Sequence, residues 1–160
     1  TGFFALHTWQ DYLIVGFGVV VIAAVCEESL FRGFMQVSFE AHGNVTRAVL
    51  ITALFFAVAH FNPWWMVQIL ILGVVLGFIS WRSGSSLPGM VVHGLNNALA
   101  LAAGGDTTGS KWAWYNTGNH VSPAVLVAAG TMLFLGFKFF LRSTENTFIE
   151  DIIPDETPAA

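Results

Sequence analysis

Three ionisable residues, Glu27, Glu28 and Arg32, interrupt a long apolar stretch near the start of the chain. Glu28 and Arg32 are four residues apart, so on a helix they share one face and can form an ion pair. Glu27 is rotated by about 100° from Glu28 on a helix of 3.6 residues per turn, so it faces a different neighbour. The alternative is that all three lie at the end of a short helix and reach water. The mostly apolar continuation over residues 33–39 makes this alternative the weaker one.

A histidine follows on the next apolar segment, at the end of the sequence Phe56-Ala57-Val58-Ala59-His60. The turn between the two segments is centred near residues 43–44, and Glu27 and His60 are equally far from it along the chain. In an antiparallel hairpin they would therefore lie at the same depth. A carboxylate level with an imidazole suits a general base or a shared metal site.

A second histidine and an amide lie on a later apolar segment. His93 and Asn97 are four residues apart and share one helix face. Together they could ligate a metal, hold a water molecule or donate hydrogen bonds to an oxyanion. The alternative is hydrogen bonding between helices, which is common for His and Asn in membranes. Taken alone, this pair favours that alternative.

The composition indicates that these residues are positioned by helices in a lipid bilayer. Of the 160 residues, 55% are hydrophobic and 10% are charged, whereas soluble domains carry about 25% charged residues. Residues 48–81 include no Asp, Glu, Lys or Arg, and this stretch is too long for one crossing of a core about 30 Å thick. The chain has no basic patch, which argues against nucleic acid as a partner. The sequence thus predicts an all-α, polytopic transmembrane helical bundle.

Breaks in the apolar pattern predict about five membrane helices. Asn62 and Pro63 separate two of them, because Asn caps helices and Pro suits the first turn. Residues 83–89 form a cluster of helix breakers. Gly73 and Gly77 form a pair of small residues that indicates a close contact between helices. The expected helices span residues 9–39, 46–61, 64–82, 88–103 and 123–142.

Two regions are expected, a membrane domain over residues 1–142 and a tail over residues 143–160. The tail holds five acidic residues and no Lys or Arg, and we expect it to be disordered at the membrane surface. With five crossings, Arg47, Arg82 and Arg142 lie on one side of the bilayer. The positive-inside rule makes that side, and with it the C-terminus, cytoplasmic.

Three sequence motifs now stand in order on successive apolar segments. They are Glu27-Glu28-Ser29-Leu30-Phe31-Arg32, then Phe56 to His60, then His93-Gly94-Leu95-Asn96-Asn97. This order resembles the CPBP family of intramembrane proteases (CAAX proteases and bacteriocin-processing enzymes, also called Abi proteins), whose motifs are EExxxR, FxxxH and HxxxN. The resemblance covers about residues 20–102. It implies a protease core in an integral membrane protein of a bacterial plasma membrane, with further helices N-terminal to this core.

The resemblance also implies a role for each matched residue. Glu27 would activate a water molecule as general base, and His60 would help to hold that water. His93 and Asn97 would stabilise the oxyanion or complete a metal site. Glu28 and Arg32 would shape the electrostatics around Glu27.

Metal use stays open at this point. A divalent metal such as zinc would have Glu27, His60 and His93 as ligands, because the chain has no HExxH pair on one helix. A metal-free glutamate mechanism is the other possibility.

The function expected from the resemblance is an intramembrane endopeptidase that hydrolyses a peptide bond of a membrane-associated substrate. That substrate would be a CAAX-type prenylated protein or a bacteriocin-like peptide. Two other functions compete: a non-catalytic immunity or scaffold protein of the same fold, and a proton or ion pathway. Straight spanning helices would place His60 and His93 at different depths. We therefore expect tilt, a submerged turn at residues 61–63, or part of residues 33–45 outside the bilayer core.

Overall fold

A computed structural model describes residues 8–104, 116–117 and 120–145. The chain divides into two compact units, Thr1–Ala102 and Ala103–Ala160. The segment that carries the three motifs lies within the first unit. The expected tail beyond residue 145 lies outside the described residues.

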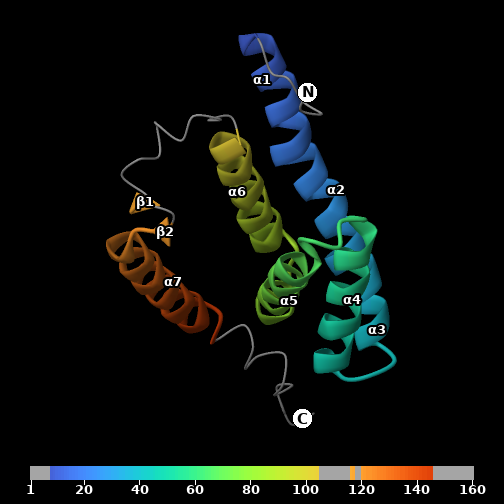
Figure 1. Ribbon diagram of the computed structural model, residues 1–160. Coiled ribbons are helices and arrows are strands. Elements are labelled where there is room, and N and C mark those ends of the chain that lie inside the picture. Colours follow the sequence, from blue (N-terminus) through green and yellow to red (C-terminus); the bar gives the residue numbers. More distant parts are fainter. Residues whose placement is uncertain (1–7, 105–115, 118–119, 146–160) are drawn as a thin grey trace, which may run out of the picture. The chain divides into compact units, whose positions relative to one another are not determined.

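The first unit begins with one continuous helix over Trp9–Glu40, drawn from blue to cyan in Figure 1. Thr8 caps its N-terminus in a capping box with Asp11. The helix consists of α1 (Trp9–Gly16), a π-helical segment (Phe17–Ala23), α2 (Ala24–Glu28), a second π-helical segment (Ser29–Gln36) and α3 (Val37–Glu40). Both acidic motif residues lie on the short α2, between the two π-helical segments. Wider π turns are frequent at functional sites.

Three further helices complete the first unit: α4 (Val45–Ala59), α5 (Met66–Ser83) and α6 (Leu87–Gly104). The side chain of Asn44 accepts a hydrogen bond from the Arg47 backbone and caps α4. Gly84 follows α5 in the left-handed conformation, at φ 62°, which glycine adopts without steric cost. These bounds agree with the predicted helices to within a few residues.

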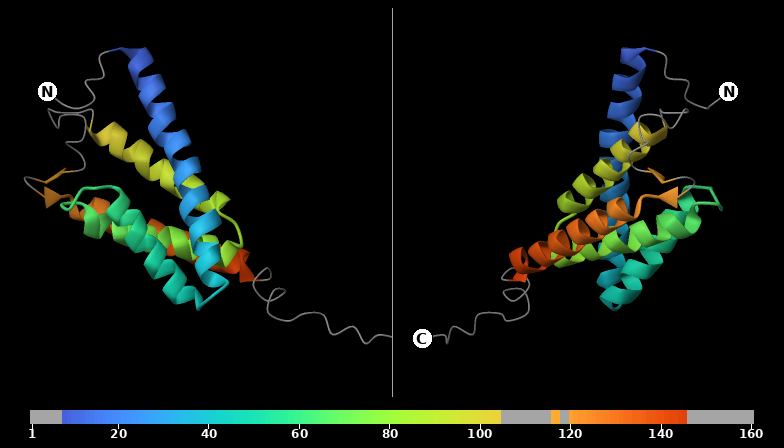
Figure 2. Two further views of the ribbon diagram at one scale, coloured as in Figure 1. Left: turned by 90° about the vertical axis from the view of Figure 1, so that its right-hand side faces the viewer. Right: turned by 60° about the vertical axis from the view of Figure 1, so that its left-hand side comes forward.

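The long helix is contacted along its length by different partners. Helix α4 follows a short turn and packs beside α3 and the second π-helical segment, and α5 packs on α4. Helix α6 runs along the N-terminal half, where the Asn97 amide donates to the Val19 carbonyl at 3.0 Å. Figure 2 shows the same arrangement from two other directions. Glu27 and Glu28 lie between these two packing regions.

Glycines allow the close approach of α5 to its neighbours. A Cβ atom at Gly73 would lie 3.1 Å from the Ala53 Cα, and one at Gly77 would lie 3.0 Å from the Val49 Cγ1. Both glycines are buried. The close helix contact predicted from this glycine pair is confirmed.

Replacement of Gly73 by alanine tests this packing. We expect Gly73→Ala to lower the free energy of unfolding by about 1–3 kcal/mol, because the added methyl group meets the backbone of α4. Gly18→Ala is the matched control, since nothing lies within 4 Å of a Cβ atom at that helical position. Thermal unfolding in detergent micelles measures both variants. Equal melting temperatures for Gly73→Ala and the wild type would contradict the packing.

The second unit contains one long helix and a minimal ladder. Helix α7 (Pro123–Ser143) starts with proline in its first turn. Strands β1 (Asn116–Thr117) and β2 (His120–Val121) pair antiparallel. They are the only strands in the described part of the chain, and the predicted helical fold class is confirmed.

Three of the described helices are long and apolar enough to cross a membrane: Trp9–Glu40, Met66–Ser83 and Pro123–Ser143. Helix α4 is apolar but shorter, with 15 residues. Helix α6 carries His93, Asn96 and Asn97 in an otherwise apolar sequence. The chain is therefore an integral membrane protein. The number of full crossings, and with it the side of the C-terminus, stays a prediction.

Candidate active site

A fully buried ion pair forms the base of the site. The Arg32 Nη1 donates to Glu28 Oε1 at 2.6 Å, and both side chains are 0% exposed. Arg32 also donates to the Gly73 carbonyl at 3.0 Å, and its guanidinium lies 4.4 Å from the centre of the Phe56 ring. The predicted pairing is confirmed. The burial of Glu28 and Arg32 argues against the alternative in which all three ionisable residues reach water from a helix end.

His93 connects this ion pair to Glu27. Its Nδ1 lies 3.0 Å from Glu28 Oε1. Glu28 Oε1 also accepts a hydrogen bond from Arg32, so Glu28 acts as an ionised carboxylate. In the hydrogen bond between His93 and Glu28 the proton therefore belongs to His93 Nδ1. The other ring nitrogen, Nε2, lies 3.9 Å from Glu27 Oε2. The buried His93 ring is thus hydrogen-bonded to the Glu28 carboxylate through Nδ1, and its Nε2 points toward the Glu27 carboxylate.

His60 approaches Glu27 from α4. Its Nδ1 lies 2.7 Å from the Phe56 carbonyl oxygen, which can only accept, so Nδ1 carries the proton. The Nε2 atom lies 3.8 Å from Glu27 Oε2. The Phe56 ring contacts both imidazoles edge-to-face, with centroids 4.7 Å from His60 and 5.6 Å from His93. The phenylalanine of the second motif therefore packs against both histidines.

The predicted convergence of Glu27, His60 and His93 is present, and the end of helix α4 contributes to it. Helix α4 ends at Ala59, so His60 is its C-terminal cap rather than part of a straight spanning helix. Phe61 then takes a positive φ of 51°, which is unusual for a bulky side chain and is found where strain serves a site. The chain therefore turns irregularly at Phe61, and the depth of this turn in the bilayer stays a prediction.

Glu27 Oε2 is the centre of this convergence. The atom is buried, yet it has no hydrogen-bond partner among the described residues. Two imidazole nitrogens lie just too far away for direct bonds. A water molecule bonds at about 2.8 Å, so one placed between these atoms could contact Glu27 and a histidine together. A buried polar atom left without a partner is costly, so Glu27 Oε2 lacks a stabilising contact that the described residues do not supply.

Asn97 lies one turn beyond His93 on α6, and its amide bonds the Val19 carbonyl. This bond is the kind of interhelical contact that the sequence offered as the alternative. Its contribution to an oxyanion site stays a prediction.

Gln36 lies one helical turn beyond Arg32 and helps to hold the long helix against α5. It was not predicted from the sequence as a site residue. It is buried, and its Nε2 donates to Glu40 Oε1 at 2.8 Å and to the Gly77 carbonyl at 3.0 Å. Arg32 and Gln36 thus bond two carbonyls, Gly73 and Gly77, that are also four residues apart. The signal in the sequence was spacing, since Glu28, Arg32 and Gln36 follow one another at intervals of four.

The three candidate metal ligands do not fit a metal as they lie. Ligand atoms around a tetrahedral zinc at about 2.0–2.2 Å are about 3.4 Å apart, and the two Glu27–histidine separations are wider. Within the described ranges, no group of three His, Cys, Asp or Glu side chains could hold a metal ion. Metal use by this site stays a prediction.

These features define a class of protein, a helical membrane protein with a polar carboxylate and histidine site between its helices. Residues 9–99 match the family model described as type II CAAX prenyl endopeptidase Rce1-like. The match covers more than half of the chain and includes all three motifs. The chain therefore belongs to this family, within the CPBP group. No curated protein and no solved structure matches it.

Proposed function

We propose that this protein is an intramembrane endopeptidase that hydrolyses a peptide bond of a membrane-associated substrate. The observation that carries the proposal is the buried, unpartnered Glu27 Oε2 between the Nε2 atoms of His60 and His93. Membership of a CAAX prenyl endopeptidase family supports the reaction class and favours a prenylated protein as substrate.

The reaction follows from the protein's own side chains. Glu27 takes a proton from a water molecule while the water oxygen attacks the carbonyl carbon of the substrate. The Nε2 atom of His60 accepts a hydrogen bond from the second O–H of that water. It is free to do so because the proton of the ring lies on Nδ1, which donates to the Phe56 carbonyl oxygen.

His93 serves the tetrahedral intermediate. In its protonated form it donates an Nε2–H to the oxyanion, and the Glu28 carboxylate on Nδ1 balances the imidazolium charge. The carbon–nitrogen bond then breaks, and the proton held by Glu27 passes to the leaving nitrogen. The oxyanion re-forms the carbonyl, so the products are a carboxylic acid and an amine, and Glu27 returns to its starting state.

A non-catalytic immunity or scaffold protein of this fold is the second candidate. Such a protein needs the Glu28–Arg32 pair for stability, but it has no use for an unpartnered carboxylate oxygen facing two histidines. A cleavage assay separates the two candidates. The wild-type protein, reconstituted in liposomes, is incubated with a farnesylated CAAX peptide, its unprenylated form and a bacteriocin-like peptide, and mass spectrometry identifies the products. Release of a fragment by wild type supports the protease, and intact peptides in all three reactions support the scaffold.

Metal dependence is tested with the same assay. We expect dialysis against EDTA to leave the cleavage rate unchanged, because no group of three His, Cys, Asp or Glu side chains among the described residues is placed to hold a metal ion. Metal analysis of the purified protein serves as the second measurement. Loss of cleavage on dialysis, with recovery on adding zinc, would overturn the metal-free reaction and assign Glu27, His60 and His93 as ligands.

A further inference from the structure

Residues 61–65, here called the aromatic turn, join α4 to α5 directly after His60 (Figure 1). Phe61 and Trp64 are 90% and 91% exposed, the highest values among the large hydrophobic side chains that the structure describes, and Trp65 is also exposed. Phe61 adopts its positive φ of 51° within this turn, a conformation that costs free energy. A turn that presents three aromatic side chains outward marks a contact surface.

The backbone of the aromatic turn indicates what kind of partner this surface meets. The Asn62 side chain accepts a hydrogen bond from the Trp64 backbone at 3.2 Å, and the Trp65 backbone donates to the Asn62 carbonyl at 3.3 Å. Among the described residues, no side chain caps the start of α5, so the N–H groups of its first turn need other acceptors. Acyl chains supply none. The partner must therefore offer hydrogen-bond acceptors as well as apolar surface.

The aromatic turn lies at one end of an antiparallel pair of helices. Gly73 lies against Ala53 and Gly77 against Val49, so the start of α4 lies beside the end of α5, and the turn is at the opposite end. Helix α5 has 18 residues, which at about 1.5 Å per residue gives a length of about 27 Å. This length nearly spans a hydrocarbon core about 30 Å thick.

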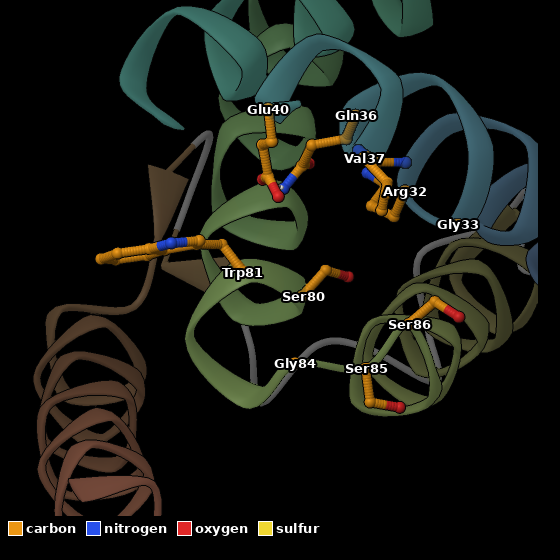
Figure 3. A pocket seen from close by; sticks show the side chains of 10 residues that line it. All are labelled: Arg32, Gly33, Gln36, Val37, Glu40, Ser80, Trp81, Gly84, Ser85 and Ser86. Carbon is orange, nitrogen blue, oxygen red and sulfur yellow. Dashed lines mark hydrogen bonds between the residues drawn. The ribbon is translucent and has the colours of Figure 1, made fainter. Parts of the chain in front are cut away.

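The end of the helix pair away from the aromatic turn carries the charged groups. Arg47 lies in the first turn of α4, and Arg82 lies in the last turn of α5. Glu40, Ser85 and Ser86 line a cavity at the same end (Figure 3). The chain between the two arginines includes no Asp, Glu, Lys or Arg. Charge at one end and exposed aromatic side chains at the other, about one bilayer core apart, are typical of a segment between two membrane surfaces.

We propose that the aromatic turn is a membrane anchor, which lies at the boundary between the headgroups and the acyl chains of one leaflet. Tryptophan rings favour this boundary because they are apolar and carry an N–H group that can bond there. Headgroups and their water supply acceptors for the uncapped start of α5. Full insertion among acyl chains would leave those N–H groups without partners, and a position in water would leave three aromatic side chains solvated.

The anchor sets the depth of the candidate site in the membrane, a consequence that rests on the proposed function. His60 directly precedes Phe61, and its Nε2 lies 3.8 Å from Glu27 Oε2. The His60 and Glu27 side chains, each about one-third exposed, therefore lie close beneath the membrane surface that the turn occupies. A substrate attached to the same leaflet would meet them at a fixed depth.

Nitroxide labels measure this depth without any measurement of activity. Phe61→Cys and Trp64→Cys, each in a Cys26→Ala background because Cys26 is exposed, are labelled and reconstituted in phosphatidylcholine vesicles. Power-saturation EPR compares the access of oxygen, which concentrates in acyl chains, with the access of a water-soluble nickel complex. Val75→Cys, at an exposed position near the middle of α5, is the deep control. His42→Cys, exposed in the turn before α4, is the control that faces water.

We expect the ratio of oxygen access to nickel access at positions 61 and 64 to lie between the ratios of the two controls. A ratio as high as at position 75 would overturn the anchor, because the turn would then be submerged among acyl chains. A ratio as low as at position 42 would overturn it as well, because the turn would lie in water. Low access of both reagents would show that protein covers the turn, and it too would overturn the anchor. If one labelled variant does not fold, the other gives the same reading.

Catalysis gives a second, separate measurement. We expect Trp64→Ala to raise KM several-fold, with kcat unchanged, for a peptide that a lipid anchors in the same vesicles. Trp64→Tyr should keep the wild-type KM, because tyrosine also favours the boundary. The KM for a soluble form of the peptide should change in neither variant.

An equal rise in KM for the anchored and the soluble peptide would show a direct disturbance of the site and would overturn the effect of depth on catalysis. Intermediate label depth in a protein that cleaves no peptide would leave the anchor standing and reject the proposed protease. Failure of the anchor and failure of the protease are therefore distinguishable.

Discussion

Glu27→Gln should abolish peptide cleavage, with a fall in kcat of about 10²–10⁴-fold. The amide has nearly the shape of the carboxylate, but it cannot take a proton from water. The Glu27 side chain is one-third exposed, and Arg32 pairs with Glu28 instead, so we expect the fold to tolerate the loss of the Glu27 charge. Steady-state cleavage of the peptide that wild type accepts measures the effect, and melting temperature reports the fold.

The matched control for this prediction is Glu145→Gln, which removes a carboxylate just after α7. It should cleave at the wild-type rate. The prediction is wrong if Glu27→Gln also keeps the wild-type rate. A loss of both activity and melting temperature in Glu27→Gln would instead show that the residue supports the fold.

Arg32→Ala should have the largest effect on stability of any single change to the site. It leaves the Glu28 carboxylate fully buried without its cation, and removal of one partner of a buried pair costs about 3–5 kcal/mol. It also removes the hydrogen bond to the Gly73 carbonyl and the contact with the Phe56 ring. Thermal unfolding and the yield of folded protein in detergent measure the loss.

A double variant separates charge from packing. Glu28→Gln with Arg32→Met removes both charges and keeps much of the volume, so it should recover most of the stability lost in Arg32→Ala. Arg47→Ala, at an exposed position on α4, should change stability little. The explanation fails if the double variant is no more stable than Arg32→Ala, because the loss would then come from packing alone.

Much of the fold could be predicted because the bilayer restricts the choices. Without water to bond the backbone, apolar segments must be helical, so the breaks at Asn62-Pro63 and residues 83–89 were enough to place the helices. The Glu28–Arg32 pair followed from its spacing of four, and the convergence of Glu27 with His60 followed from their equal distance to the turn.

Other features of the site could not be predicted because they depend on contacts between distant segments. Nothing in the sequence near Gln36 shows that its amide bonds the Gly77 carbonyl. The π-helical segments around α2 likewise have no local signature. The position of His93 between the two glutamates required the packing of α6 against the long helix.

The sequence by itself determined that this chain is a helical membrane protein with three polar motifs on successive apolar segments. Hydrophobicity, spacing and helix breakers are local properties, and a bilayer turns them directly into helices. Only the tertiary structure decided that Glu27 keeps an unpartnered oxygen between two imidazoles while Glu28 is neutralised by Arg32. That difference between adjacent glutamates arises because neighbouring residues on a helix face different partners, and the partners come from α4, α5 and α6.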